Sequence, residues 1–311
     1  MHIYHSVSEC NTPTQTIVTI GTFDGVHLGH KTLIQELNKI AFESSLTAVI
    51  LTFNPHPRLV IFPDDNGLQL LNTLEEKIEL FRTSGVQHLI IHPFTKEFSR
   101  LSSADFVRNI LHNQLKVKKL IIGHDHHFGR NRQGSIAELE ELAPLYDFEV
   151  TQLNEVTIGN TVISSTKIRN ALLDGKVEVA NKYLGYSYAL TGAVIHGKKL
   201  GRTLGFPTAN MAVVNTKLIP SNGVYAVTVT INDEPITYYG LLSIGNRPTF
   251  DNGEKSVEVF IINFDRDIYE RTITVTLQHF LRTDQKFNSA DELITQMKKD
   301  KVQAEEIFGV R

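Results

Sequence analysis

Residues 17–30, with the sequence IVTIGTFDGVHLGH, constrain the fold of this chain more than any other stretch. The apolar first part is typical of a buried strand, and after Gly21 the chain turns into a helix that carries His27 and His30 near its start. A helix N-terminus offers backbone N–H groups and a partial positive charge, and glycine lets a ligand approach the backbone closely. The two histidines share one helical face because they are three positions apart. This arrangement predicts a site for a polyanionic phosphate, although a tight turn with two surface histidines is the simpler interpretation.

The composition is that of a globular protein large enough for two domains. The chain has 311 residues, of which 41% are hydrophobic and 21% charged. A formal net charge of −3 argues against a general nucleic-acid binder, which would carry a basic field. The single cysteine, Cys10, excludes an intrachain disulfide framework and a cysteine-based zinc site. No apolar run approaches the roughly 18 residues of a membrane span, so we expect a cytoplasmic protein that binds neither nucleic acid nor membrane.

Strand and helix patterns alternate through the first half of the chain. The predicted strands cover residues 17–20, 46–53, 87–92, 117–122 and 148–153. The predicted helices cover residues 27–43, 73–85, 102–113 and 135–145. Single helices between strands indicate a parallel sheet that is covered on both faces and binds ligands at its carboxyl edge.

The second half has the pattern of an antiparallel fold. Short runs rich in Val, Ile, Thr and Tyr alternate with turn residues, which suggests an antiparallel sheet or a small barrel. These runs cover residues 188–195, 224–231, 236–243, 257–262 and 272–277. A capping box at residues 289–292 opens a final helix that is expected to end near residue 299. The change of pattern near residues 184–187 predicts two domains, residues 1–186 and 187–311.

Three more strings in the first half place polar groups after predicted strands. Residues 53–57, FNPHP, hold Asn54 and His56 between two prolines, as a rigid turn or as part of a site. Residues 123–134, GHDHHFGRNRQG, contain three histidines, but adjacent residues of an extended loop mostly point apart, so no metal centre is expected there. Residues 163–169, ISSTKIR, place hydroxyls at a helix start with Arg169 one turn in, which suits a phosphate clamp or a plain N-cap.

The second half contains a glycine-rich basic loop. Residues 192–198 match G-x-x-x-x-G-K, but the next residue is Lys199 rather than Ser or Thr, and the stretch up to Pro207 cannot form the helix that a P-loop requires. The loop combines glycines with cations, at His196, Gly197, Lys198, Lys199, Gly201 and Arg202. It is therefore either a solvated connection between strands or an anion site.

Together, the strings of the first half resemble the nucleotidyltransferase domain of bacterial FAD synthetases. G-T-F-D-G-V-H-L-G-H resembles the H-x-G-H signature of enzymes that transfer an adenylyl group from ATP, and S-S-T-K-I-R matches the family string S-S-T-x-I-R for the ATP phosphates. GHDHHFG resembles the loop G-x-D-F-x-F-G, with His126 where the family usually has Phe. The resemblance implies catalytic roles for His27 and His30. It implies nucleotide or flavin contacts from Gly21, Phe23, Asp24, Asn54, His56, Asp125, Phe128, Ser164, Ser165, Thr166 and Arg169.

The second half resembles the riboflavin kinase domain of the same family, through the string G-x-V-x-x-G-x-x-x-G-R-x-L-G-F-P-T-A-N. In that family the threonine and asparagine of P-T-A-N hold metal-bound ATP, which implies that Thr208 and Asn210 bind Mg²⁺. Glu258 occupies the position of the catalytic glutamate, whereas its pattern alone is that of an exposed strand carboxylate. Phe260 replaces the usual His, and Asn263 stands where Asp is common. The implied ligand contacts come from Gly197, Lys198, Gly201, Arg202, Pro207 and Arg282.

The resemblance implies an α/β chain in which a Rossmann-like parallel sheet is followed by an antiparallel β-barrel of the riboflavin kinase type and a terminal helix. It implies a bifunctional enzyme whose C-terminal domain phosphorylates riboflavin to FMN and whose N-terminal domain adenylates FMN to FAD with release of pyrophosphate. Both reactions would use ATP and Mg²⁺. The expected partners are these small molecules, and the expected state is a monomer or a weak homo-oligomer. The alternatives are a chain that retains one activity and a flavin or nucleotide sensor without turnover.

Overall fold

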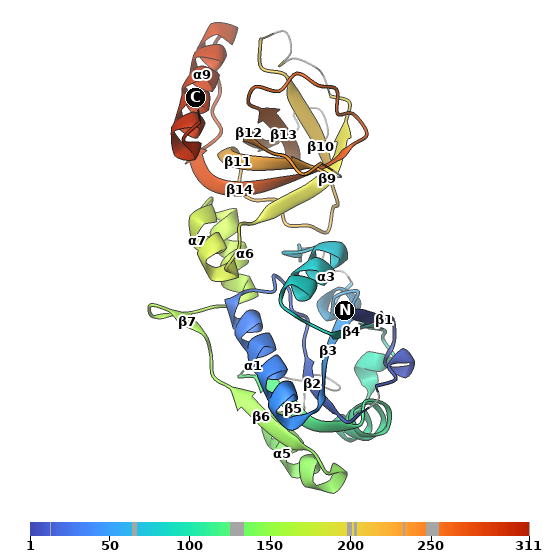
Figure 1. Ribbon diagram of the computed structural model, residues 1–311. Helices are drawn as coiled ribbons and strands as arrows, with labels where there is room; N and C mark the ends of the chain where they lie inside the picture. The colour runs from blue at the N-terminus through green and yellow to red at the C-terminus, as the bar shows by residue number, and fades with distance from the viewer. Residues whose placement is uncertain are drawn as a thin grey trace. The chain divides into compact units, whose positions relative to one another are not determined.

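The computed structural model describes residues 1–12, 14–63, 67–124, 134–197, 201, 204–232, 234–246 and 255–310. Contacts divide the chain into two compact units, residues 1–164 and 165–311, which are coloured along the chain in Figure 1. A functional boundary at residues 186 and 187 stays a prediction. Within the described ranges, no helix combines the length and the apolar character that crossing a bilayer requires.

The first unit is built on a six-stranded parallel sheet with helices on both faces (Figure 1). The strand order is β1-β4-β3-β2-β5-β6, and every neighbouring pair is parallel. The strands are β1 (His2–Tyr4), β2 (Thr16–Ile20), β3 (Thr47–Asn54), β4 (His88–Pro93), β5 (Val117–Gly123) and β6 (Glu149–Leu153). The expected parallel sheet is confirmed. The edge strand β1 was not predicted, because three residues carry too little periodicity to read.

The helices of this unit cover two separate apolar cores. They are α1 (Leu28–Ser44), α2 (Pro57–Ile61), α3 (Leu74–Thr83), α4 (Ser103–Asp105), the π-helix η3 (Phe106–Gln114) and α5 (Ile136–Leu142). Side chains of α1 and α3 pack with Ile17 and Ile50 on one face, and those of η3 and α5 pack with Val18 and Leu51 on the other. Neighbouring residues of a strand point to opposite faces of the sheet, so one strand contributes side chains to both cores. The described residues of this unit also form three 3₁₀ turns, η1 (Val7–Glu9), η2 (Phe98–Arg100) and η5 (Ala143–Tyr146), and a hairpin of β7 (Thr157–Ile158) and β8 (Thr161–Val162).

Two helices of this unit depart from their predicted form. The helix that Ser102 caps continues beyond Asp105 with π-type winding. The predicted helix over residues 135–145 ends as α5 at Leu142 and continues as the 3₁₀ turn η5, which contains Pro144. Proline has no N–H to donate and its ring clashes with the preceding helical turn, so the α-helix ends before it.

The second unit is a closed antiparallel barrel in the order β10-β13-β12-β11-β14-β9. Its strands are β9 (Ala189–Ile195), β10 (Thr208–Val213), β11 (Gly223–Ile231), β12 (Thr237–Asn246), β13 (Lys255–Ile261) and β14 (Thr272–Arg282). The helices α6 (Ser165–Leu173) and α7 (Val177–Leu184) precede the barrel, and α9 (Ala290–Phe308) follows it. The barrel is confirmed, but β10 was not predicted. This strand contains alanine and asparagine, which are depleted in strands, so its sequence did not predict it.

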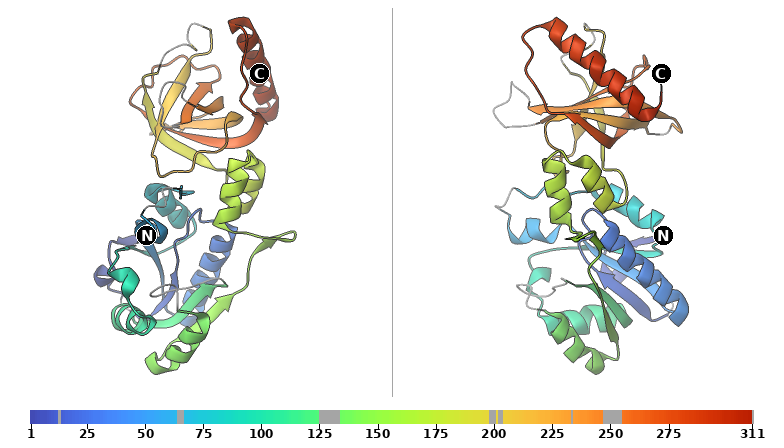
Figure 2. Two further views of the ribbon diagram at one scale, coloured as in Figure 1. Left: turned by 180° about the vertical axis from the view of Figure 1, so that it is seen from behind. Right: turned by 90° about the vertical axis from the view of Figure 1, so that its left-hand side faces the viewer.

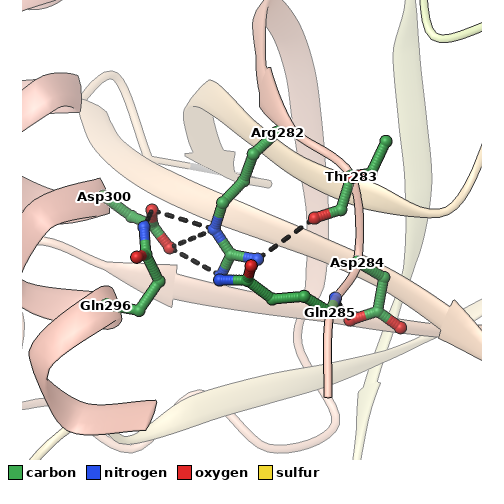
Figure 3. Close-up of polar contacts among 6 residues, drawn as sticks. All are labelled: Arg282, Thr283, Asp284, Gln285, Gln296 and Asp300. Atoms are coloured by element: carbon green, nitrogen blue, oxygen red, sulfur yellow. Dashed lines mark hydrogen bonds and ion pairs between the residues drawn. The ribbon is translucent and has the colours of Figure 1, made fainter. Parts of the chain in front are cut away.

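The terminal helix α9 is longer than predicted, running to Phe308 rather than to about residue 299, and it lies along the outside of the barrel against β11 and β12 (Figure 2). A buried ion pair attaches it. The Nε of Arg282 donates to both carboxylate oxygens of Asp300 at 3.0 Å, and its Nη2 donates to Oδ2 at 2.8 Å (Figure 3). Gln296 adds a bond from Nε2 to Asp300 at 2.8 Å. This ion pair lies at the predicted end of the helix, and the helix continues beyond it to Phe308, with Gly309 as the C-cap.

We expect Asp300→Asn to loosen α9, because removing one partner of a buried ion pair costs roughly 3 kcal/mol or more. Arg282 is partly exposed, which lowers the expected free-energy cost. Hydrogen–deuterium exchange of the α9 amides should quicken roughly tenfold or more. The exposed Glu306 on the same helix provides the control variant Glu306→Gln. Equal exchange in both variants would show that the ion pair does not hold the helix.

Candidate active sites

The loop between β2 and α1 has backbone angles that most residues avoid. Phe23, Gly25 and Val26 have φ values of +49°, +86° and +33°. For residues other than glycine such angles are strained, and surrounding packing must hold them. Phe23 and Val26 supply that packing because both are buried, and the Phe23 ring meets the rings of His30 and Phe81 edge-on at 5.1 and 5.4 Å.

The two histidines of the signature form one stacked pair at the start of α1. Their ring centroids are 3.7 Å apart and the ring planes differ by 15°. His27 is the N-cap residue, and its Nδ1 accepts a hydrogen bond from the His30 backbone N–H at 3.4 Å. A Cβ on Gly29 would lie 3.2 Å from two atoms of the His27 ring, so the glycine leaves room for this stacking. The structure thus brings the two imidazoles together as predicted, but with His27 at the N-cap rather than on a face of the helix.

The environment of His30 favours the neutral imidazole. Burial lowers the pKa of His30 well below its ordinary value of 6.5, and the neighbouring His27 and Lys77 lower it further. Among the described residues, the Nδ1 atom of His30 is buried and has no hydrogen-bond partner. A neutral imidazole still offers one N–H donor, so His30 can donate to a phosphate oxygen without carrying charge.

Two buried charged residues lie at the same loop. Lys77 of α3 is 7% exposed, and its Nζ donates to the carbonyl oxygen of Thr22 at 2.9 Å. Asp24 is 2% exposed, and its Oδ1 accepts from the Leu71 N–H at 2.9 Å. Asp24 was predicted as a site residue but Lys77 was not. The sequence does carry a signal for it, since Lys77 is within one helical turn of both Leu74 and Phe81.

Other predicted residues of the first unit lie at the carboxyl end of the sheet. Asn54 is the exposed last residue of β3, and His56 caps α2 by accepting from the Arg58 N–H at 3.2 Å. Gly21 follows β2, and its N–H donates to the Leu51 carbonyl at 3.1 Å. Asp125 and Phe128, together with His126, lie outside the described residues.

The residues of the predicted phosphate clamp fall on either side of the point in the sequence where the first compact unit ends. Ser164 is the last residue of the first unit, and Ser165, Thr166 and Arg169 lie in the first half of α6. The hydroxyls therefore do stand at a helix start, as expected. That they serve the same site as His27 stays a prediction.

The second unit brings the predicted kinase residues together on two paired strands. Asn210 on β10 lies directly opposite Glu258 on β13, and the Oγ1 of Thr208 donates to Oε2 of Glu258 at 3.1 Å. A Cβ on Gly197 would lie 2.1 Å from the Asn210 Nδ2, so only glycine allows this approach. The chain therefore presents a hydroxyl, an amide and a carboxylate at one place.

The other predicted residues of this unit lie beside the strands. The Gly201 carbonyl accepts from the Phe206 N–H at 2.8 Å, and Pro207 is exposed directly before β10. Lys198 and Arg202 lie outside the described residues. Arg282 uses its guanidinium on Asp300 and on the Thr283 carbonyl, which gives it a structural role (Figure 3). Ligand contact by Arg282 stays a prediction.

Comparisons with known proteins match each half of the chain to a separate family model. The model described as FAD synthetase matches residues 9–167, and the model described as riboflavin kinase matches residues 184–308. These matches and the two sites define a chain of the flavin-nucleotide transferase class.

Relatives that match nearly the whole chain indicate the same class of protein. The chain is 39% identical over 311 residues to a bifunctional riboflavin kinase/FMN adenylyltransferase of Listeria monocytogenes, covering 99% of this chain and 98% of that protein. It is 36% identical over 295 residues to the Escherichia coli protein of the same name, with 94% and 93% covered. A crystal structure from Streptococcus pneumoniae, described as a macrolide-efflux protein, has a TM-score of 0.87 and 33% identity, covering 96% of this chain and 97% of that one. The chain belongs to the family of bifunctional riboflavin kinase/FMN adenylyltransferases.

The lowered pKa of His30 predicts a stability that falls in acid. The unfolded chain takes up a proton near pH 6.5, whereas the buried imidazole stays neutral to a lower pH. Below pH 6.5 the unfolded state therefore binds more protons, and the stabilisation present above that pH is lost as the pH falls. Between pH 7 and pH 5 this should cost on the order of 1 kcal/mol.

Urea unfolding of wild type and His30→Gln at both pH values measures the effect. The variant should lose less unfolding free energy on acidification than wild type. His5→Gln, at an exposed position, is the control. Parallel losses in wild type and His30→Gln would contradict the assignment.

Proposed function

We propose that this chain makes FAD from riboflavin in two ATP-dependent steps, one at each candidate site. The observation that carries the proposal is the pairing of two unlike sites in one polypeptide. The stacked His27 and His30 stand at a helix start in one unit, and Thr208, Asn210 and Glu258 meet on paired strands in the other. Each site lies within the match to the corresponding family model.

In the kinase step, the oxygen of the ribityl hydroxyl attacks the γ-phosphorus of ATP, and ADP leaves. Glu258 accepts the proton of that hydroxyl. The hydrogen bond from Thr208 holds the carboxylate in place for this transfer. Thr208 and Asn210 present hydroxyl and amide oxygens, which are hard donors of the type that Mg²⁺ prefers, so the donor set fits this ion. When bound, Mg²⁺ would neutralise charge on the ATP phosphates.

In the adenylylation step, a phosphate oxygen of FMN attacks the α-phosphorus of ATP, and the bond to the pyrophosphate leaving group breaks. The protein forms no covalent bond. Its task is to hold two anions together and to donate hydrogen bonds to the charge that develops. The backbone N–H groups at the start of α1 and the imidazoles of His27 and His30 supply such donors. Hydroxyls of Ser164, Ser165 and Thr166, with Arg169, bind the triphosphate in this proposal.

The remaining assignments extend this proposal. A functional boundary at residues 186 and 187 is supported by the FAD synthetase match ending at residue 167 and the riboflavin kinase match beginning at residue 184. Further ligand contacts are proposed for Gly21, Phe23, Asp24, Asn54, His56, Asp125, Phe128, Gly197, Lys198, Gly201, Arg202, Pro207 and Arg282. A cytoplasmic location, a monomeric or weakly oligomeric state and the lack of a nucleic-acid partner stay predictions.

Two substitutions should separate the two activities. His30→Ala should lower FAD formation from FMN roughly 100-fold or more, because a donor to the developing charge is lost. It should leave FMN formation from riboflavin unchanged. Glu258→Gln, which removes the proton acceptor and keeps the side-chain shape, should give the reverse pattern.

Purified protein with Mg–ATP and either riboflavin or FMN, followed by chromatography of the flavins, gives both rates. If wild type releases neither ADP nor pyrophosphate, the chain is a sensor rather than an enzyme. If both variants lose the same single activity, the assignment of one reaction to each site is wrong.

Gly197→Ala should impair the kinase step alone. The new Cβ would displace the Asn210 amide, which it would otherwise approach to 2.1 Å. A displaced ligand group should raise the KM for Mg–ATP and lower FMN formation roughly tenfold or more. FAD formation from FMN by the same preparation is the internal control. An unchanged KM for Mg–ATP would remove Asn210 from the nucleotide site.

A further inference from the structure

A lysine stands where helix packing favours an apolar residue. Lys77 lies on the buried side of α3, near Phe81, which packs in the core beneath α1. Burying an ammonium group is costly unless it is hydrogen-bonded and paired. Packing alone would be better served by leucine or methionine at this position. The lysine therefore has a role other than filling the core.

The contacts of Lys77 lead to the loop before α1. Its Nζ donates to the carbonyl oxygen of Thr22 at 2.9 Å, in the middle of the strand-to-helix turn. Thr52 donates to the same oxygen at 3.4 Å from β3. Lys77 of α3 thus holds the carbonyl group of Thr22. This residue directly precedes Phe23, the first strained position of the loop.

Charge at this loop is balanced by a second buried group. Burial lowers the pKa of the Lys77 ammonium, and Asp24 opposes that effect. Asp24 in turn accepts the Leu71 N–H, which ties the loop to the segment before α3. The carboxylate and the ammonium are therefore both fixed by the backbone around them.

The charge of Lys77 also reaches the stacked imidazoles. The described ionisable groups that act on His30 are His27 from the start of α1 and Lys77 from α3, and both lower the pKa of His30 in addition to burial. Two imidazolium rings with centroids 3.7 Å apart would repel each other strongly. The ammonium of Lys77 adds to the effects of burial and of His27 in disfavouring a charged His30.

We propose that Lys77 is a positioning residue of the adenylyl-transfer site, which holds the loop through the Thr22 carbonyl and places a positive charge beside the loop that leads to His27 and His30. This inference rests on the proposed adenylylation of FMN by the first unit. Lys77 itself contacts neither substrate, and it acts through the loop backbone and through His30.

The test compares Lys77 variants in the full-length chain, with FAD formation from FMN as the readout and FMN formation from riboflavin as the internal control. Lys77→Met should lower kcat for FAD formation roughly tenfold or more through misplacement of the loop. It should move the acid limb of the pH profile upward, because a positive charge that disfavours protonation of His30 is removed. Arg82→Met, at an exposed position on the same helix, should change neither value.

Two further variants separate the two roles and cover a Lys77→Met protein that does not fold. Lys77→Gln keeps a donor for the Thr22 carbonyl but removes the charge, so its acid limb should move upward while its kcat falls less than that of Lys77→Met. Lys77→Arg keeps both the donor and the charge, and its acid limb should match that of wild type.

Identical pH profiles for Lys77→Gln and Lys77→Arg, or a kcat for Lys77→Met equal to that of Arg82→Met, would overturn the inference. Failure of the proposed function would be seen in a different result, because the wild-type protein would then make no FAD from FMN. Titration of His30 by nuclear magnetic resonance in Lys77→Gln gives a readout that does not depend on activity. An unchanged His30 titration would overturn the electrostatic role.

Discussion

The pairing of β2 between β3 and β5 is the constraint on which the first unit depends. Because all three strands run in the same direction, the turn after β2 must emerge at the carboxyl edge of the sheet. The chain then enters α1 at once, so its backbone N–H groups and the two imidazoles stand beside that edge. Burial of Phe23 and Val26 holds the strained turn in place. Burial of the neighbouring His30 lowers the pKa of its imidazole and so favours the neutral form, which can donate a hydrogen bond.

Closure of the barrel has the corresponding role in the second unit. β10 pairs with β9 on one side and with β13 on the other, which brings Ile195 and Glu258 to either side of Asn210. The β9 end then leads to Gly197, where the lack of a side chain leaves space for the Asn210 amide. Gly197 and Glu258 are 61 positions apart in the sequence, and folding brings them, with Asn210 between them, to one oxygen-rich site. Register in the sheet sets this geometry, because a slip of one residue would turn Glu258 to the other face.

The sequence predicted elements whose signals are local. The capping box at Thr73 and Glu76 forms with both of its hydrogen bonds, at 3.2 and 3.0 Å. The strands β2 to β6 follow apolar runs, and each of their ends agrees with the prediction to within one residue. The misses have local causes as well. β1 is too short to show a period, β10 is poor in strand-forming residues, and the buried Asp300 resembles an exposed residue of a polar helix until its partner Arg282 is known.

For the candidate sites, the sequence by itself determined which chemical groups are present and the order in which they follow strands and helices. It also determined that His27 and His30 lie three positions apart at the start of a helix, whereas the structure places His27 at the N-cap, just before the first helical residue. Tertiary structure decided what lies across from these groups. The hydrogen bond from Thr208 to Glu258, the approach of Lys77 to the Thr22 carbonyl and the anchoring of α9 all join distant segments. No local pattern encodes such contacts, because they arise only when separate elements bury their apolar faces against one another.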